Sequence, residues 1–340
     1  MSLLEVRDLN VEFDTLDGPV HAVRHLSYSL EAGQALGIVG ESGSGKTVSV
    51  LTLMRLLAGN ARVTGGEMLL GGQDVLRLSE QQMRAIRGSR VSMIFQDPMT
   101  ALNPVERIGR QVGLTVEYHD RSATRQSVRR RVVETLESVG VPDAARRSDQ
   151  YPHQWSGGMR QRAVIAMALI NQPELIVADE PTTALDATVQ AQVLDVLRTA
   201  RAERGCSLIM ISHDLGVVRE IADDVLVMYA GTTAERCPTE TVFRDARHPY
   251  TRALVRARPG WGPRTERLFT IAGRPPDLLD VPVGCPFEPR CTESHGLPAC
   301  RTETPAPMQL GPDHVSACHR ARELDRIDEL VLADSNGEPS

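Results

Sequence analysis

The chain has 340 residues, 24% of them charged and only 4% aromatic, and its formal net charge is −6. This charge argues against a nucleic-acid binder, whose affinity depends on neutralising phosphates, and the length predicts two or three structural units. Apolar runs such as "AVIAMALI" stop at eight residues, far short of the roughly 20 that a membrane span needs. The start "MSLLEVRDLN" has no signal-peptide pattern. We therefore expect a cytoplasmic protein.

The first 75 residues read mainly as β-structure. The segments "LLEVRDLNVEF" and "AVRHLSYSL" alternate apolar and polar residues on either side of a turn at "LDGP". The segment "ALGIV" (35–39) predicts a short buried strand, and "GGEMLLGGQDV" (65–75) predicts a hairpin. Between them, "TVSVLTLMRLL" (47–57) has helical length and an apolar face. The order of strand, glycine-rich loop and helix sets the context for the motif that lies between residues 40 and 47.

The stretch "GESGSGKT" (40–47) matches the phosphate-loop pattern G-x-x-x-x-G-K-[ST]. Lys46 is the only lysine, since the other 37 of the 38 basic residues are arginine. A compact ammonium fits a tight loop as a point charge, whereas arginine is a planar fork. In such a loop Lys46 reaches the β- and γ-phosphates, and the hydroxyl of Thr47 ligates Mg²⁺. The sequence therefore predicts a nucleotide-phosphate site.

Two further motifs lie in the central part of the chain. The segment "PELIVADEP" (173–181) reads as a buried strand that runs into two acids. Asp179 could hold Mg²⁺ through water, and Glu180 could polarise an attacking water. In "WSGGMRQRAVIAMALI", Ser156 opens an apolar helix, either as a simple N-cap or as a second anion-binding helix terminus.

The same region gives the fold class. Residues from Arg107 to about Arg147 have a helical, arginine-rich pattern, and the run "RSATRQSVRRR" lacks the interleaved aromatics of a nucleic-acid site. We expect it to be the solvated face of a helix. The segment "ATVQAQVLDVLRTARAERG" predicts a helix closed by Gly205, and "CSLIMISHD" and "ADDVLVMYAG" predict two more strands. Strands that alternate with helices indicate a parallel sheet covered on both faces.

Together these motifs resemble the nucleotide-binding subunit of ABC transporters over about residues 3–235. The resemblance implies an α/β fold: a P-loop NTPase (RecA-like) core, an antiparallel β subdomain, a helical subdomain at about 97–160 and a small C-terminal extension with cysteines. It implies an ATPase that uses ATP and Mg²⁺. The resemblance implies three catalytic residues, Glu180, His213 and Gln96, and three residues that hold Mg²⁺, Thr47, Gln96 and Asp179. It implies that ATP is bound by Phe13, Gly40, Ser42, Gly43, Gly45, Lys46, Thr47 and Asp186. The ATP of the partner subunit is contacted by Ser156, Gly157 and Gly158.

Within that family, three stretches resemble the ATP-binding subunits of oligopeptide and dipeptide importers, a group that includes nickel importers. They are "FQDPMTALNP" (95–104), "QWSGGMRQR" (154–162) and "DEPTTALDATVQAQVL" (179–194), whose residues 184–186 lie in the D-loop. The segment "RHPYTRALVRARP" (247–259) resembles their C-terminal extension, with no obvious chemistry in its His-Pro-Tyr. Met159 stands where the signature usually has glutamine, and we expect little loss from this.

The resemblance implies the motor of a di- or oligopeptide importer at the cytoplasmic face of the cell membrane. Its partners are a second ABC subunit (identical or paralogous), two transmembrane permeases and an extracytoplasmic solute-binding protein, with no nucleic acid. A nickel or other small-solute importer is the alternative within the family. The alternative from another class is a soluble ABC ATPase that works on DNA or ribosomes, but only 132 residues separate Lys46 from Asp179. A third alternative is a metal-sensing regulatory protein.

The C-terminal part, residues 236–320, holds four of the six cysteines: Cys285, Cys291, Cys300 and Cys318. Their spacing, C-x5-C-x8-C-x17-C, contains no C-x2-C pair, which weighs against an ordinary zinc ribbon. Four thiolates around one centre suit a [4Fe–4S] cluster, which several importer subunits of this type are expected to carry. Zn²⁺, with His295, His314 or His319 in place of a thiol, remains an alternative, as do unligated thiols. Residues 321–340 are expected to form a mobile acidic tail.

Overall fold

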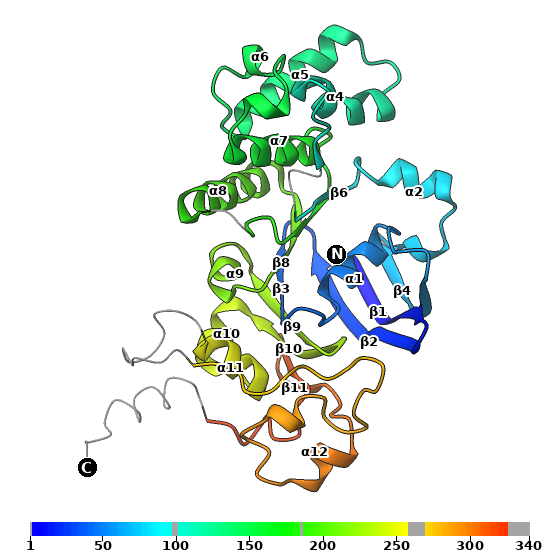
Figure 1. The fold of residues 1–340 in the computed structure, drawn as a ribbon, viewed down its shortest axis with the longest axis vertical. Coiled ribbons are helices and arrows are strands. Elements are labelled where there is room, and N and C mark those ends of the chain that lie inside the picture. Colours follow the sequence, from blue (N-terminus) through cyan, green and yellow to red (C-terminus); the bar gives the residue numbers. More distant parts are fainter. Residues whose placement is uncertain (1, 97–100, 184–185, 258–268, 326–340) are drawn as a thin grey trace, which may run out of the picture. The chain divides into compact units, whose positions relative to one another are not determined.

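The computed structural model of the chain describes residues 2–96, 101–183, 186–257 and 269–325. The chain divides into two compact units whose segments alternate along the sequence (Figure 1). Unit 1 comprises Met1–Leu3, Leu30–Ala35 and Arg77–Ile211. Unit 2 comprises Leu4–Ser29, Leu36–Leu76 and Ser212–Ser340. Both units therefore draw on distant parts of the sequence.

Unit 1 is built on three parallel strands, β6 (Val91–Ile94), β7 (Leu175–Asp179) and β8 (Ser207–Ser212). The middle strand, β7, pairs in parallel with both neighbours and buries all five of its residues. Strands covered on both faces are continuously apolar rather than alternating, as "LIVAD" is. Because β6 and β7 run in the same direction, Gln96 and Glu180, which follow them, lie at the same edge of the sheet.

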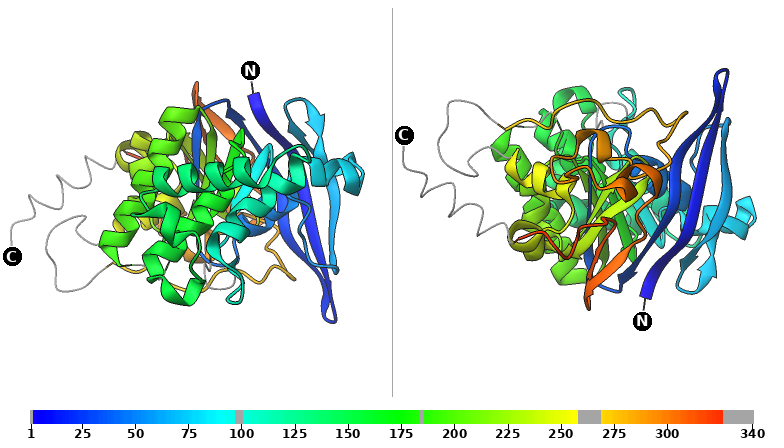
Figure 2. Two further views of the ribbon diagram at one scale, coloured as in Figure 1. Left: turned by 90° about the horizontal axis from the view of Figure 1, so that it is seen from above. Right: turned by 90° about the horizontal axis from the view of Figure 1, so that it is seen from below.

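The unit 1 helices between residues 108 and 204, teal to green in Figure 2, bury apolar side chains. A Cβ atom added at Gly113 on α4 would lie 2.7 Å from Cγ1 of Val128 on α5, so this glycine allows the two helices to approach closely. The helical elements are α2 (Glu80–Ile86), α4 (Ile108–His119), α5 (Arg125–Ser138), α6 (Ala144–Arg147), the short 3-10 helix η2 (Pro152–Gln154), α7 (Gly157–Leu169) and α8 (Ala187–Arg204).

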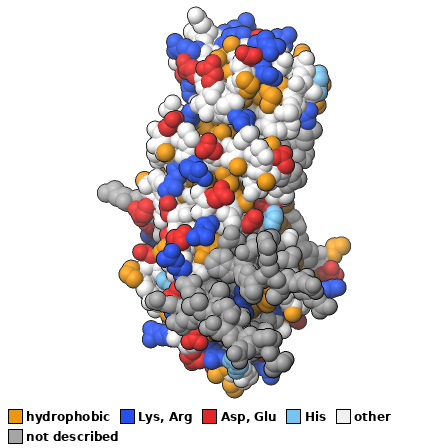
Figure 3. Space-filling model, turned by 90° about the vertical axis from the view of Figure 1, so that its left-hand side faces the viewer, with side chains coloured by type: hydrophobic (Ala, Val, Ile, Leu, Met, Phe, Trp, Pro, Cys, Tyr) orange, Lys and Arg blue, Asp and Glu red, His pale blue; other side chains and the backbone are white. Residues whose placement is uncertain are grey.

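The arginine-rich stretch leads into α5 and forms a solvated face on it, as the sequence predicted. Arg125, Arg129 and Arg130 are exposed, whereas Val128 and Val132 of the same helix are buried. Arg129 pairs with Asp149 at 2.9 Å. Basic side chains gather at the upper end of the view in Figure 3, the end that carries α4 to α6 in Figure 1.

Unit 2 contains an antiparallel sheet of four strands in the order β2-β1-β4-β5. Its strands are β1 (Ser2–Thr15), β2 (Gly18–Glu31), β4 (Ala61–Leu70) and β5 (Gln73–Asp74). The predicted hairpin at 65–75 is formed by β4 and β5, which pair antiparallel around the turn. The short 3-10 helix η1 (Val75–Arg77) follows.

A second set of strands in unit 2 has the order β11-β12-β10-β9-β3. β3 pairs in parallel with β9, and β10 pairs antiparallel with both β9 and β12. β10 therefore spans the boundary that we predicted at residue 235 and joins the extension to the core. The strands are β3 (Ala35–Val39), β9 (Asp224–Tyr229), β10 (Thr232–Pro238), β11 (Met308–Gly311) and β12 (His314–Ser316).

An aromatic core joins the C-terminal extension, yellow to orange in Figure 2, to the rest of unit 2. Phe243, Tyr250 and Phe287 are buried together with apolar side chains of β3 and β9. The helical elements of this unit are α1 (Lys46–Leu53), α9 (Leu215–Ile221), α10 (Thr239–Asp245), α11 (Pro249–Arg256), the 3-10 helix η3 (Glu288–Arg290) and α12 (Pro298–Thr302).

Two boundaries differ from the sequence expectations. The helix expected over 47–57 ends at Leu53, because Arg55 adopts a left-handed φ of 49° and the N–H of Leu56 donates back to the carbonyl of Leu51, as in a Schellman motif. Ala321 and Leu324 are buried, so residues 321–325 belong to the folded extension and not to a mobile tail. Residues 326–340 lie outside the described part of the chain.

Candidate functional site

Two glycines of the loop 40–47 lie so close to other backbone atoms that a side chain would not fit. A Cβ atom at Gly40 would lie 2.3 Å from the carbonyl oxygen of Met228, and one at Gly45 would lie 2.4 Å from that of Ala22. Gly45 also has a φ of 95°, which side chains disfavour. Larger residues at these two positions would therefore displace the loop.

Lys46 lies inside this loop, with only 6% of its surface exposed. Its Nζ atom donates hydrogen bonds to the carbonyl oxygens of Gly40 at 2.8 Å and Glu41 at 2.9 Å. Ser42, Gly43 and Thr47 are exposed on the outer side of the loop. The helix α1 begins at Lys46 without a side-chain cap, an arrangement that suits an anion at the helix start.

The two acids follow β7 in unit 1. Asp179 is the last residue of the strand and is buried. Glu180 comes next with a left-handed φ of 47°, a strained conformation of the kind that concentrates at functional sites. Its carboxylate accepts hydrogen bonds from Nε2 of Gln96 at 3.1 Å and from the hydroxyl of Thr183 at 2.8 Å. The structure thus gathers Gln96 and Glu180, and it adds Thr183, which sequence reasoning missed.

The serine-glycine stretch opens α7 in unit 1. Ser156 is the N-cap, and its hydroxyl accepts from the N–H of Met159 at 3.4 Å. A Cβ atom added at Gly157 would point into open space, whereas one at Gly158 would meet Val189. The sulfur of Met159 accepts a hydrogen bond from Arg147 at 3.6 Å, so this side chain is occupied within its own unit.

The remaining predicted residues lie at element boundaries. Asp186 is the N-cap of α8 and accepts from two backbone N–H groups at 3.0 Å each. His213 is exposed just after β8. Phe13 is half-buried in β1, opposite Ala61. Residues 184 and 185 of the predicted D-loop lie outside the described residues. Phe13, Lys46 and His213 belong to unit 2, and the acids and Ser156 belong to unit 1.

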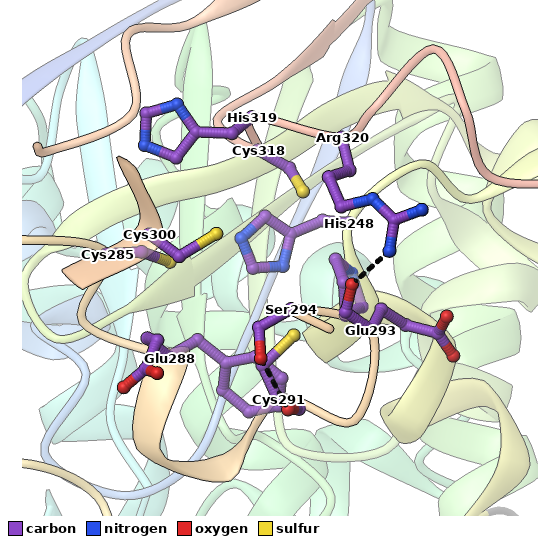
Figure 4. A pocket seen from close by; sticks show the side chains of 12 residues that line it. His248, Cys285, Glu288, Cys291, Glu293, Ser294, Cys300, Cys318, His319 and Arg320 are labelled. Carbon is purple, nitrogen blue, oxygen red and sulfur yellow. Dashed lines mark hydrogen bonds between the residues drawn. The ribbon is translucent and has the colours of Figure 1, made fainter. Parts of the chain in front are cut away.

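The four C-terminal cysteines line one small pocket in unit 2 (Figure 4). The pocket measures about 20 Å³, so it has room for about one water molecule. His248 and Phe287 also line it, and in Figure 4 the thiols surround the imidazole of His248. The sequence missed His248 because its His-Pro-Tyr segment carries no ligand spacing. The cysteines are Cys285, Cys291, Cys300 and Cys318.

Burial controls the protonation of these groups. It raises the pKa of Cys285 to about 11 and that of Cys318 to about 12, and the neighbouring thiols add to the shift. Burial also raises the pKa values of Cys291 and Cys300 and lowers the pKa of His248 to about 4. The pocket thus holds neutral thiols and a neutral imidazole at neutral pH, and a bound cation would favour the thiolates.

As they stand, the four sulfur atoms lie too far apart to bind one metal ion together. Four sulfurs at about 2.3 Å from one tetrahedral zinc ion would lie about 3.8 Å apart. Within the described residues, no three of these sulfurs lie within 4.8 Å of one another. Among the three histidines considered as substitutes, His319 lines the pocket, whereas His295 is exposed beside Glu293 and His314 contacts Glu235.

A second group of possible metal ligands consists of Glu235, Cys237 and His314. All three residues are buried, and their ligand atoms lie within 4.8 Å of one another. The carboxylate of Glu235 accepts the backbone N–H groups of Arg247 at 2.6 Å and His248 at 3.0 Å, and it lies 2.7 Å from Nε2 of His314. These hydrogen bonds satisfy the buried carboxyl group and explain its closeness to His314. We therefore read it as the anchor that holds β10, β12 and the start of α11 together.

Comparisons with known proteins agree with this arrangement. A family model described as "ABC transporter" matches residues 23–183, and one described as "Oligopeptide/dipeptide transporter, C-terminal region" matches residues 234–300. The oligopeptide transport ATP-binding protein OppD of Salmonella typhimurium is 46% identical over 321 residues, which are 94% of each chain. The chain belongs to the ATP-binding proteins of oligopeptide/dipeptide ABC transporters. The dipeptide transport ATP-binding protein DppD of Lactococcus lactis is also 46% identical, over 92% of this chain and 89% of its own.

Solved structures of ABC cassettes share the fold. A dimeric ATP-binding cassette in a post-hydrolysis state, bound to ADP and Pi, has a TM-score of 0.63 and 24% identity over 69% of this chain and 98% of its own. The cassette cbiO1 from Clostridium perfringens has a TM-score of 0.61 over 71% of this chain and 90% of its own. This ABC protein has no helix among its described residues that is long and apolar enough to cross a membrane.

Proposed function

We propose that the chain is the ATP-hydrolysing motor subunit of an importer for di- and oligopeptides. The observation that carries the proposal is that one chain combines a match to the ABC transporter model with a C-terminal region of the peptide-transporter type. Relatives named for oligopeptide and dipeptide transport match it along nearly its whole length. Closure of two cassettes on ATP, followed by hydrolysis, would then move the permeases.

In this proposal the phosphate loop and the acids divide the chemistry. Lys46 neutralises the β- and γ-phosphates, and Thr47 and Asp179 hold Mg²⁺ together with Gln96. Glu180 orients and polarises the attacking water. The support for its role is that Gln96 and Thr183 both hold its carboxylate.

The other predicted residues complete the site in a dimer. His213 acts beside the γ-phosphate, and Phe13 stacks on the base. Ser156, Gly157 and Gly158 contact the ATP of a partner cassette. Asp186, in the D-loop, also binds ATP. The exposure of Ser156 and of Gly157 on their own unit supports an intermolecular role.

The partners follow from the same reading. One chain carries one set of motifs, so the motor needs a second ABC subunit, identical or paralogous. Two permeases, joined by an extracytoplasmic solute-binding protein, would hold it at the cytoplasmic face of the cell membrane. The exposed arginine face of α5 lies on the helical part that docks on a permease.

We further propose that the four cysteines hold a [4Fe–4S] cluster. Two observations support it: all four thiols line one pocket, and no three of their sulfurs lie as close together as one tetrahedral zinc ion requires. Such a cluster supplies bonds that order this Pro-rich segment. Iron and sulfide assays on anaerobically purified protein test this. One equivalent of zinc without visible absorbance would leave the zinc alternative standing.

Uptake measurements test the motor assignment. The native organism would carry Glu180→Gln in place of the wild-type chain, with Glu203→Gln, an exposed acid on α8, as the matched control. We expect loss of labelled di- and oligopeptide uptake in the first strain only. Loss of nickel uptake alone would move the chain to the metal-importing branch. If expression is normal and neither uptake changes, with redundant importers deleted, the transport proposal is wrong and a soluble ABC ATPase takes its place.

A further inference from the structure

We propose that Arg290 positions the phosphate loop through Glu41, so that nucleotide binding is energetically coupled to the conformation of the cysteine pocket. The inference deepens the proposed function, since it rests on ATP binding at this loop. Glu41 is the second residue of the loop, and Arg290 immediately precedes Cys291. Both residues belong to unit 2.

The two side chains form a bidentate ion pair. Nη1 of Arg290 donates to Oε2 of Glu41 at 2.7 Å, and Nη2 donates to Oε1 at 2.9 Å. The side chain of Arg290 is only 4% exposed and that of Glu41 is 24% exposed. Two parallel charge-assisted hydrogen bonds fix orientation as well as distance. The pair therefore fixes the direction in which the side chain of Glu41 points away from the loop.

Two further donors of Arg290 are also occupied. Its Nε atom donates to the carbonyl of Ala272 at 2.9 Å, and Nη1 donates to the hydroxyl of Tyr229 at 3.2 Å. Its guanidinium carbon lies 5.8 Å from the ring centres of both Tyr229 and Phe287. A lysine could not make this set of contacts. Arg290 is thus rigidly held where it meets the loop.

A second side chain of the extension is hydrogen-bonded to Glu41. The backbone N–H of Glu41 donates to the hydroxyl of Tyr250 at 2.8 Å. Tyr250 is the tyrosine of the His-Pro-Tyr segment and is fully buried on α11. Its ring lies 4.6 Å from that of Tyr229 and 5.3 Å from that of Phe287. Glu41 is therefore held by both its main chain and its side chain.

From Glu41 the connection reaches the phosphate-binding lysine. The carbonyl oxygen of Glu41 accepts the hydrogen bond from Nζ of Lys46 at 2.9 Å. When phosphate oxygens become the partners of Lys46, this hydrogen bond changes. The position of Glu41 thus sets part of the free-energy difference between the empty and the occupied loop.

On the other side, Arg290 lies in a compact turn between two cysteines. The N–H of Glu288 donates to the carbonyl of Cys285 at 2.9 Å, and the N–H of Cys291 donates to that of Glu288 at 3.0 Å. Phe287 lines the pocket and packs on the ring of Tyr250. A change in the separation of the two thiols would therefore move Arg290. Coupling of this kind is reciprocal, so nucleotide must also affect the turn.

The first arm of the test is nucleotide affinity in the purified full-length chain, measured with a fluorescent ATP analogue. Arg290→Gln and Glu41→Gln remove the ion pair, and Arg290→Lys keeps the charge but loses the fork. Arg301→Gln breaks an exposed pair with Glu288 in the same segment and is the matched control. We expect about tenfold weaker binding in both Gln variants, an intermediate value for the lysine variant, and no change in the control.

The second arm is hydrogen–deuterium exchange, which reports on each segment separately. In the wild type we expect ATP to slow exchange at 40–47 and at 285–291. In Arg290→Gln, saturating ATP should still protect 40–47 but no longer protect 285–291. A purely structural role for the pair would leave 285–291 insensitive to nucleotide in the wild type as well.

Different results would contradict the proposed ATPase function and the coupling through Arg290. If the wild type does not bind ATP, the proposed function fails. If the wild type binds ATP but the folded Gln variants bind it equally well, or if nucleotide never affects 285–291, the coupling through Arg290 is overturned. Should Arg290→Gln not fold, Glu41→Gln, which retains the hydrogen bond to Tyr250, decides the matter.

Discussion

Gln96 donates a hydrogen bond from Nε2 to Oε2 of Glu180, 3.1 Å away. The two residues are 84 positions apart in the sequence and meet because β6 and β7 are neighbouring parallel strands. The hydroxyl of Thr183 donates to the same carboxylate oxygen at 2.8 Å. Both donors orient the carboxyl group of Glu180, which the proposal makes the general base.

Glu180→Gln tests this role. The amide has nearly the same shape and still accepts hydrogen bonds, so we expect ATP binding to be retained. Hydrolysis should fall by about 10²-fold or more, because one preorganised catalytic group is lost. Phosphate release and nucleotide binding would be measured on the same preparation, with Glu203→Gln as the control. Turnover at the wild-type rate would remove Glu180 from its assigned role.

Lys46→Arg tests why the chain has lysine at one position only. The arginine fork is larger than the ammonium group, and the buried loop around Lys46 offers two carbonyl acceptors at 2.8 and 2.9 Å. Hydrogen bonds to charged groups contribute about 1.5–3 kcal/mol, so we expect nucleotide affinity to fall by about 10- to 100-fold. Arg198→Lys on exposed α8 is the control, with unchanged affinity. Equal affinity in Lys46→Arg would contradict the steric argument.

The buried histidine of the His-Pro-Tyr segment predicts a pH-dependent stability. Its pKa falls from 6.5 to about 4 in the folded chain, mainly because burial disfavours the charged form. The unfolded state therefore binds more protons between these values, so the free energy of unfolding decreases as the pH is lowered through this window. From pH 7 to pH 5 the loss from His248 alone is about 2 kcal/mol.

Urea unfolding at pH 7 and pH 5 would measure this loss. His248→Asn keeps a side chain that can cap α11 but does not titrate. We expect the variant to lose about 2 kcal/mol less than the wild type between the two pH values. The same pH dependence in both proteins would mean that His248 is not the responsible group.

The thiol pKa values predict proton release on metal binding. With Cys285 near 11 and Cys318 near 12, these thiols are protonated at pH 7.5, and each must lose a proton to become a ligand. Zn²⁺ added as a probe to metal-free protein should release about four protons if the four thiols rearrange around the ion. Apparent affinity should consequently rise with pH.

Calorimetry in two buffers with different ionisation enthalpies counts these protons. Cys318→Ser should lower the count by about one, and Cys206→Ser, at a buried cysteine outside the pocket, should leave it unchanged. Release of fewer than two protons by the wild type would show that the pocket does not act as a four-thiolate site.

Features that depend on a local pattern could be predicted from the sequence. The apolar run "LIVAD" was predicted as a buried strand, and β7 is buried throughout. Gly205 ends α8 with a left-handed φ of 65°, as a C-terminal glycine should. The glycine-rich loop was predicted from the order of strand, loop and helix, and the cysteine pocket from composition and spacing.

Features that depend on distant partners could not be predicted. Arg290 and Glu41 are 249 positions apart, and Tyr250 and Glu41 are 209 apart. No periodicity relates such residues. Tyr250 reads as an ordinary packing aromatic, and His248 as a turn residue, until the fold brings one to the phosphate loop and the other to the thiols. Thr183 was overlooked because its hydrogen bond depends on the strained backbone of Glu180.

Because the sequence has a single lysine, its only side-chain amine lies in the phosphate loop. Any acylating reagent, cross-linker or cellular acetylation aimed at a lysine side chain can react with this chain only at Lys46, where 6% exposure makes the reaction slow. A modified lysine therefore reports a loop that has opened, and a bound nucleotide would shield the amine. Mass measurement of the peptide that contains Lys46 would then follow how fast this amine is labelled with and without nucleotide.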